Sequence, residues 1–177
     1  MSNFNSQKII APIMRFVNMK GIIALKDGML AILPLTVVGS LFLIIGQLPF
    51  EGLNQAIASV FGDTWTEPFM QVYSGTFAIM GLISCFSIGY SYAKNSGVEP
   101  LPAGVLSLSS FFILLKSSYV PAKGEPIGDA IAKVWFGGQG IIGAIIIGLV
   151  VGAIYTVFIQ RHIVIKMPEQ VPQAIAK

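Results

Sequence analysis

The chain has 177 residues, of which 54% are hydrophobic and only 11% are charged, and its mean hydropathy is +0.78. A soluble domain carries about 25% charged residues, so this composition excludes an ordinary soluble domain and indicates a protein that lies mostly in a lipid bilayer. The formal net charge of +3 does not indicate nucleic-acid binding, because the basic residues flank apolar runs singly or in pairs. The single cysteine, Cys85, excludes an intrachain disulfide and a metal site built from several cysteines.

The first part of the chain, residues 1–24, has a basic amphipathic pattern. On a helical wheel, most of its apolar side chains fall on one side and Lys8, Arg15 and Asn18 on the other, with Lys20 as the exception. Such a segment lies on the membrane surface rather than across it. We therefore expect an interfacial helix here, and a partly disordered tail is the alternative.

A transmembrane module is expected over residues 25–162, and its first two crossings are predicted over residues 28–50 and 69–93. Each of these stretches is uncharged and long enough for a helix of about 30 Å, the thickness of the hydrocarbon core. Pro34 predicts a kink in the first helix. The interval between the two crossings is polar, and residues 55–60 within it predict a short surface helix.

The third apolar segment is shorter, and a tight turn predicted over residues 94–97 precedes it. A helix over about 101–118 just spans the bilayer if the Lys116 side chain extends to the surface, and a re-entrant segment is the alternative. With four crossings, the side that holds both termini carries eight of the basic residues: Lys8, Arg15, Lys20, Lys26, Lys94, Arg161, Lys166 and Lys177. The other side carries three: Lys116, Lys123 and Lys133. This bias favours four crossings with both termini in the cytoplasm.

The loop over residues 119–135 contains a Lys123-Gly124 turn signal, which predicts a small external hairpin. The fourth crossing, over residues 138–160, has no charge between Gly140 and Ile159. The remaining residues, 163–177, are interrupted by proline and predict a cytoplasmic segment. The fold class is therefore all-α, a four-crossing helical membrane module.

Two ladders of small residues repeat at every fourth position, so each lies along one face of its helix. In membranes such a face lets a second helix approach closely. We predict that the two ladders pack on each other, and ordinary membrane-helix composition is the alternative. The predicted helix-packing residues are Gly81, Cys85, Gly89 and Ala93 in the second crossing, and Gly140, Ala144, Gly148 and Gly152 in the fourth.

Residues that could carry chemistry are few. Cys85 lies in the middle of an apolar run, where a small packing residue is expected and a reactive thiolate is not. His162 has no Cys, Asp or Glu cluster around it in the sequence, so it does not indicate a metal site. No charged residue lies deep inside a predicted span, where ion and proton pathways usually place one. The sequence thus predicts no catalytic, cofactor or metal site, and no enzyme activity for this chain by itself.

Several motifs together resemble the sugar-specific enzyme IIC permeases of the bacterial phosphotransferase system. Residues 24–29 (ALKDGM), 33–35 (LPL) and 39–43 (GSLFL) resemble the opening of these permeases. Residues 135–140 (WFGGQG) and 167–172 (MPEQVP) resemble the lactose/cellobiose/diacetylchitobiose branch. The resemblance implies import of a β-linked disaccharide such as cellobiose or diacetylchitobiose through the bacterial inner membrane. It also implies phosphorylation of the sugar by enzyme IIB and IIA partners.

The chain departs from the family in length, because such permeases are well over twice as long. In the family, the second half holds the sugar, and the first half is associated with scaffolding and with homodimer formation. The resemblance therefore implies an N-terminal scaffold and dimerisation part, with the main sugar site expected beyond Lys177. The alternative is a small stand-alone membrane protein that forms an oligomeric scaffold or pore.

Overall fold

The structure is a computed structural model that describes residues 15, 17–121, 125 and 127–163. The predicted interfacial helix falls largely outside the described residues, as do the Lys123-Gly124 turn and all but the first residue of the predicted segment 163–177. The described helices, in chain order, are α2 (Lys20–Ala31), α3 (Leu33–Gly46), α4 (Glu51–Phe61), α5 (Glu67–Gly75), α6 (Met80–Asn95), α7 (Pro100–Leu114) and α8 (Ile141–Gln160). Three short 3-10 turns complete the helical structure: Phe77–Ile79, Lys133–Phe136 and Gly138–Gly140.

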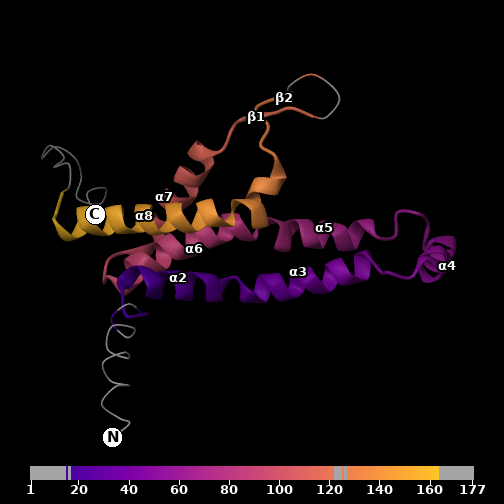
Figure 1. Cartoon of the computed structure of the whole chain (residues 1–177), viewed down its shortest axis with the longest axis horizontal. Coiled ribbons are helices and arrows are strands. Elements are labelled where there is room, and N and C mark those ends of the chain that lie inside the picture. The colour runs from indigo at the N-terminus through magenta and orange to yellow at the C-terminus, as the bar shows by residue number, and fades with distance from the viewer. Residues whose placement is uncertain (1–14, 16, 122–124, 126, 164–177) are drawn as a thin grey trace, which may run out of the picture.

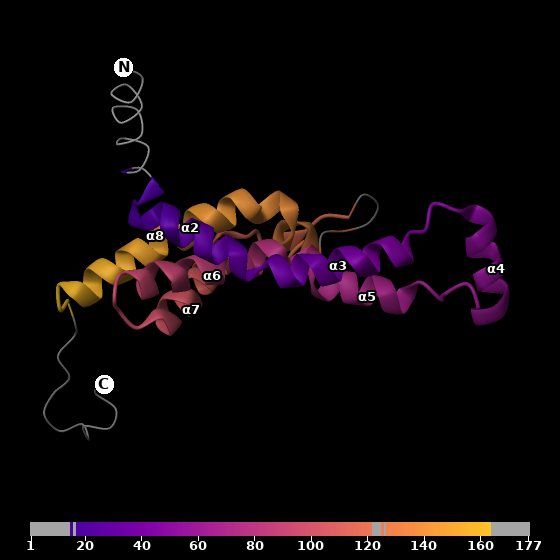
Figure 2. The ribbon, with the colours of Figure 1, turned by 90° about the horizontal axis from the view of Figure 1, so that it is seen from below.

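Helices α2 and α3 run antiparallel to α5 and α6 and form one long helical hairpin (Figure 1). The register of the hairpin is visible in its closest approaches: Gly28 faces Ile88, Gly39 faces Phe77 and Gly46 faces Met70. Helix α4 joins the two arms, and no residue of α4 is buried. In both views, α3, α4 and α5 extend away from the remaining helices as a projecting arm (Figures 1 and 2).

The other half of the hairpin belongs to a bundle that is centred on α6. Helix α6 packs against α2, α7 and α8, and its pairing with α8 is the most extensive in the molecule. The start of α6 lies beside the backbone of Gly137, just before α8, and its end lies beside the end of α8, where Gln160 Nε2 donates to the Ser96 carbonyl at 3.0 Å. Helices α6 and α8 therefore run parallel, and α7 returns the chain between them.

Proline fixes the start of three helices. Pro34, Pro68 and Pro100 occupy the first turn of α3, α5 and α7, where the missing backbone N–H has no partner in any case. The kink predicted at Pro34 is a short interruption between two helices, because α2 ends at Ala31 and α3 begins at Leu33.

Three helical segments have the length and apolar composition to cross a membrane: residues 20–46, 67–95 and 138–160. The first begins at Lys20, eight residues before the predicted start, because Lys26 and Asp27 are accommodated inside α2 rather than at its entry. Helix α7 ends at Leu114 and has 15 residues, so a fourth crossing is not confirmed by its length.

The small hairpin predicted in the loop before α8 is confirmed. Strand β1 (Ser118–Tyr119) pairs antiparallel with β2 (Ile127–Gly128). The short helix predicted around residues 55–60 is also present, as part of α4. The all-α class therefore holds, apart from this two-stranded element.

Helices α6 and α8 finish at the same end of the bundle, and the hydrogen bonds after their last turns follow the same pattern. After α6, Gly97 has a φ of 74° and donates to the Lys94 carbonyl, while Val98 donates to the Ala93 carbonyl. After α8, His162 has a φ of 51°, and the N–H groups of His162 and Ile163 bond in the same pattern. These are Schellman motifs, which satisfy the last carbonyls of a helix. His162 thus ends a helix.

We expect Gly97→Ala to lower the stability of the bundle by about 1 kcal/mol, because a side chain at positive φ is strained. Thermal unfolding in detergent should show a lower melting temperature. Gly143→Ala is the matched control, because a methyl group at Gly143 meets nothing within 4 Å and alanine favours the helix. Equal melting temperatures for Gly97→Ala and the parent would contradict this assignment.

Candidate functional site

The central feature of the bundle is the surface of α6, where small residues bring three helices close to its backbone. Seven of the 16 residues of α6 are buried, more than in any other described helix: Gly81, Ser84, Cys85, Ile88, Gly89, Ser91 and Ala93. In lipid there is no hydrophobic drive between helices, so such contacts depend on close packing.

The contact between α6 and α8 depends on two glycines of the second ladder. A methyl group added at Gly148 would lie 2.8 Å from the Cys85 carbonyl oxygen and 3.0 Å from Ile88 Cβ. A methyl group added at Gly152 would lie 2.9 Å from Tyr92 Cβ and 3.2 Å from Gly89 Cα. Both positions therefore have space only for a hydrogen atom.

The other members of the two ladders face several different neighbours. Cys85, Ala93 and Ala144 are fully buried. An added methyl group would meet Ser107 of α7 at Gly89, the backbone of Phe136 and Gly137 at Gly81, and the Trp135 carbonyl at Gly140. The structure therefore brings Cys85 and Gly89 of the first ladder beside the second ladder, whereas Gly81 and Gly140 face the segment that leads into α8.

Sequence reasoning missed the small residues of α2 and α7. A methyl group at Gly28 would lie 2.6 Å from Ile88 Cγ1, and one at Gly104 would lie 2.7 Å from the Phe86 ring. Ala24 and Ala103 are fully buried beside them. The spacing of four between Ala24 and Gly28 is the signal that could have identified the α2 face.

Two buried hydroxyl groups of the bundle bond within their own helices, whereas Thr156 Oγ1 is buried and has no hydrogen-bond partner among the described residues. Ser84 Oγ donates to the Met80 carbonyl at 2.7 Å, and Ser107 Oγ donates to the Ala103 carbonyl at 2.8 Å. The Cys85 thiol donates to the Ser107 carbonyl at 3.2 Å and so links α6 to α7. Within the described ranges, no three His, Cys, Asp or Glu residues are grouped as a metal site.

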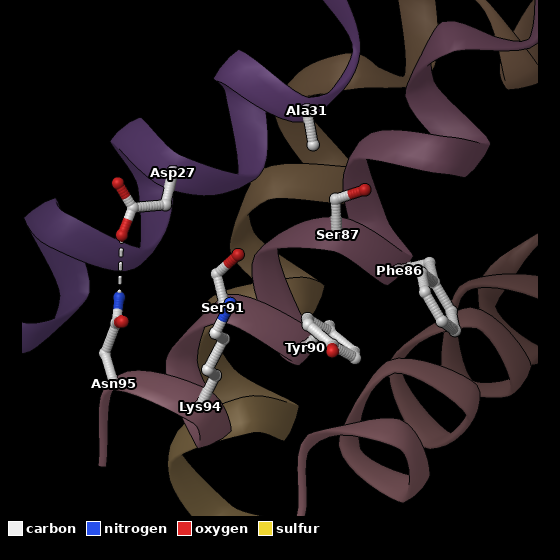
Figure 3. A pocket seen from close by; sticks show the side chains of 8 residues that line it. All are labelled: Asp27, Ala31, Phe86, Ser87, Tyr90, Ser91, Lys94 and Asn95. Carbon is white, nitrogen blue, oxygen red and sulfur yellow. Dashed lines mark hydrogen bonds between the residues drawn. The ribbon is translucent and has the colours of Figure 1, made fainter. Parts of the chain in front are cut away.

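A polar groove lies on the remaining face of α6, beside α2 (Figure 3). Its cavity volume is about 320 Å³. Two α2 residues and six α6 residues line this polar groove: Asp27 and Ala31, and Phe86, Ser87, Tyr90, Ser91, Lys94 and Asn95. At its mouth, Asp27 Oδ2 accepts a hydrogen bond from Asn95 Nδ2 at 2.9 Å, and Asp27 Oδ1 pairs with Lys26 Nζ at 3.2 Å.

The long apolar segments and the close helix contacts around α6 define the class of this molecule. It is a helical membrane protein, and three of its described segments are long and apolar enough to cross the bilayer. Residues 26–177 match the family described as "Phosphotransferase system, EIIC". The chain therefore belongs to the EIIC family of the phosphotransferase system, which confirms the resemblance seen in the sequence.

Two relatives of this chain are named for lichenan and for cellobiose. It is 38% identical to the lichenan permease IIC component of Bacillus subtilis, over 97% of this chain and 39% of the relative. It is 38% identical to the cellobiose-specific EIIC component of Geobacillus stearothermophilus, over 87% of this chain and 35% of the relative. The crystal structure of the transporter ChbC, the IIC component of an N,N'-diacetylchitobiose-specific phosphotransferase system, matches with a TM-score of 0.84 and 32% identity. That match covers 98% of this chain and 41% of ChbC, so the chain spans about two fifths of these proteins.

We expect Gly148→Leu to destabilise the folded bundle, because the larger side chain would push α8 away from the Cys85 carbonyl. Overpacking of this kind typically costs about 1–3 kcal/mol, and thermal unfolding in detergent measures it. Gly143→Leu is the matched control in the same helix, since Gly143 faces open space, and it should melt like the parent. A Gly148→Leu protein with unchanged melting but an altered oligomeric state would instead place Gly148 in a subunit contact.

Proposed function

We propose that this chain is the N-terminal scaffold part of a permease that imports a β-linked disaccharide such as cellobiose or diacetylchitobiose. The observation that carries this proposal is the closed interior of the bundle around α6. Helices meet there through glycine, alanine and serine, and the Ser84 and Ser107 hydroxyls bond to their own backbone. Such an interior positions helices, and its close-packed small residues leave little space for a sugar between α6 and its neighbours. The names of the relatives support the class of sugar.

The sugar site and the phosphoryl transfer belong, in this proposal, to other parts of the system. Enzyme IIB and IIA components would carry the phosphoryl group, which fits the family to which the chain belongs. A homodimer is the proposed assembly. Large apolar side chains exposed on α3 and α8, such as Ile44 and Ile142, support a contact with lipid or with a second copy.

The proposed topology in the bacterial inner membrane has four crossings and both termini in the cytoplasm. The parallel course of α6 and α8 supports it, because α7 and its flanking residues must lead back from the Ser96 end of α6 to the Gly81 end. A helix of 15 residues covers about 22 Å, and the residues after Leu114 complete the distance. The bias of basic residues toward one side supports the orientation.

Cysteine labelling in a Cys85→Ala background tests this topology. The exposed residues Glu99, Gly128 and Ile163 are replaced one at a time by cysteine, and intact cells are treated with a membrane-impermeant maleimide. Only position 128 should react, and positions 99 and 163 should react after the cells are made permeable. Labelling of position 163 from outside, with position 99 protected, would make α7 re-entrant.

We also expect this chain by itself to bind no disaccharide firmly. Isothermal titration calorimetry with cellobiose and with N,N'-diacetylchitobiose should give no saturable heat, because the interior around α6 is filled by closely packed small residues and the Ser84 and Ser107 hydroxyls bond to their own helices. A full-length EIIC relative serves as the positive control. A sub-millimolar affinity that Tyr90→Ala abolishes would instead place a sugar site in the polar groove.

A further inference from the structure

The polar groove changes in character along its length. It follows α6 from Phe86 to Asn95, a distance of about 13 Å along the helix. Asp27, Lys94 and Asn95 lie at one end, whereas Ala31 and Phe86 lie toward the other (Figure 3). The groove is therefore polar at one end and apolar at the other, along the axis of α6.

The polar end of the groove lies where two helices finish. Helix α6 ends at Asn95 and α8 ends at Gln160, and the two ends are joined by the bond from Gln160 to Ser96. Arg161 follows α8 directly. Charged and amide groups at helix ends belong at the level of the lipid headgroups. The apolar end of the groove then lies at the level of the acyl chains.

The two opposite charges at this polar end, on Asp27 and Lys94, can each form further bonds to a ligand. The Asp27 carboxylate is 37% exposed and uses one bond on each oxygen, to Asn95 and to Lys26, although a carboxylate has about four acceptor positions. The exposed Lys94 ammonium makes no ion pair within the described part of the chain. Between them lies the Ser91 side chain, and the Tyr90 side chain is beside it (Figure 3).

We propose that the groove binds one phospholipid whose headgroup carries a primary amine, of the phosphatidylethanolamine type. The lipid phosphate accepts from Lys94, and the lipid ammonium donates to Asp27. One acyl chain extends over Ala31 and the Phe86 ring. A covering apolar helix fits this groove poorly, because it would remove the Lys94 ammonium from water without giving it a partner.

Native mass spectrometry of the full chain in detergent tests the proposal, with dioleoyl-phosphatidylethanolamine and dioleoyl-phosphatidylcholine as matched probes. Both lipids carry one phosphate and one positive nitrogen, but only the ethanolamine has N–H donors. We expect phosphatidylethanolamine to bind about tenfold more tightly, which corresponds to about 1.4 kcal/mol. Equal affinity for the two lipids would overturn the proposal, as would tighter binding of dioleoyl-phosphatidylglycerol.

Two substitutions separate the two charges of the site. Asp27→Asn should remove the preference for phosphatidylethanolamine over phosphatidylcholine, and Lys94→Gln should weaken both lipids by a similar factor. Lys116→Gln, at an exposed lysine outside the groove, is the control and should change neither affinity. Unchanged binding in both groove variants would overturn the proposal.

Ser87→Leu provides a test that touches neither charge. Ser87 lines the middle of the groove and is half-buried, so leucine there fills the space that the lipid needs and should abolish binding of both lipids. The melting temperature of each variant in lipid-free detergent reports whether the bundle is intact. If Asp27→Asn or Lys94→Gln lowers the melting temperature, the result for Ser87→Leu decides whether the groove binds lipid. A folded Ser87→Leu protein that still binds phosphatidylethanolamine would refute the site. Sugar calorimetry tests the proposed function, whereas these lipid measurements test the groove.

Discussion

The close approach of three helices to α6 is the constraint on which the rest of the bundle depends. In a bilayer the lipid tails are as apolar as the helices, so association relies on dispersion between surfaces that fit closely. Gly28 and Gly148 both contact Ile88, from α2 and from α8, and each has space only for a hydrogen atom. Ile88, which is fully buried, is therefore held between two glycine surfaces.

This packing also fixes the direction of the chain. Because Gly148 and Gly152 meet successive turns of α6 in the same order, α8 is parallel to α6, and the chain must return between them. Both helices then finish at one end of the bundle, where Gly97 and His162 close them with the same hydrogen-bond pattern. Lys94, Glu99 and Arg161 lie near that end in the sequence, and the polar groove opens beside Lys94.

The bundle is closely packed inside and polar at one end, which agrees with the proposed role as the scaffold of an EIIC permease. Ser84 and Ser107 are fully buried and donate to the backbone of their own helices, so their hydroxyl hydrogens are not available to a sugar. The groups that remain available, Asp27 and Lys94, lie on the outside of the bundle where lipid has access. In the proposed scaffold, the groups that can bind a ligand therefore face the membrane rather than the interior of the bundle.

The sequence by itself determined that this is a membrane protein, and it located the apolar segments, the small hairpin and the family. Those properties follow from composition, length and local motifs. The tertiary structure decided which neighbour each small residue faces, because a spacing of four identifies a shared face but not the element across from it. Gly140 and Gly148 share a ladder, yet the first meets the Trp135 carbonyl and the second meets α6. The first crossing was predicted from residue 28, but α2 begins at Lys20. Asp27 therefore lies inside that helix, where Asn95, 68 residues later, donates to its carboxylate.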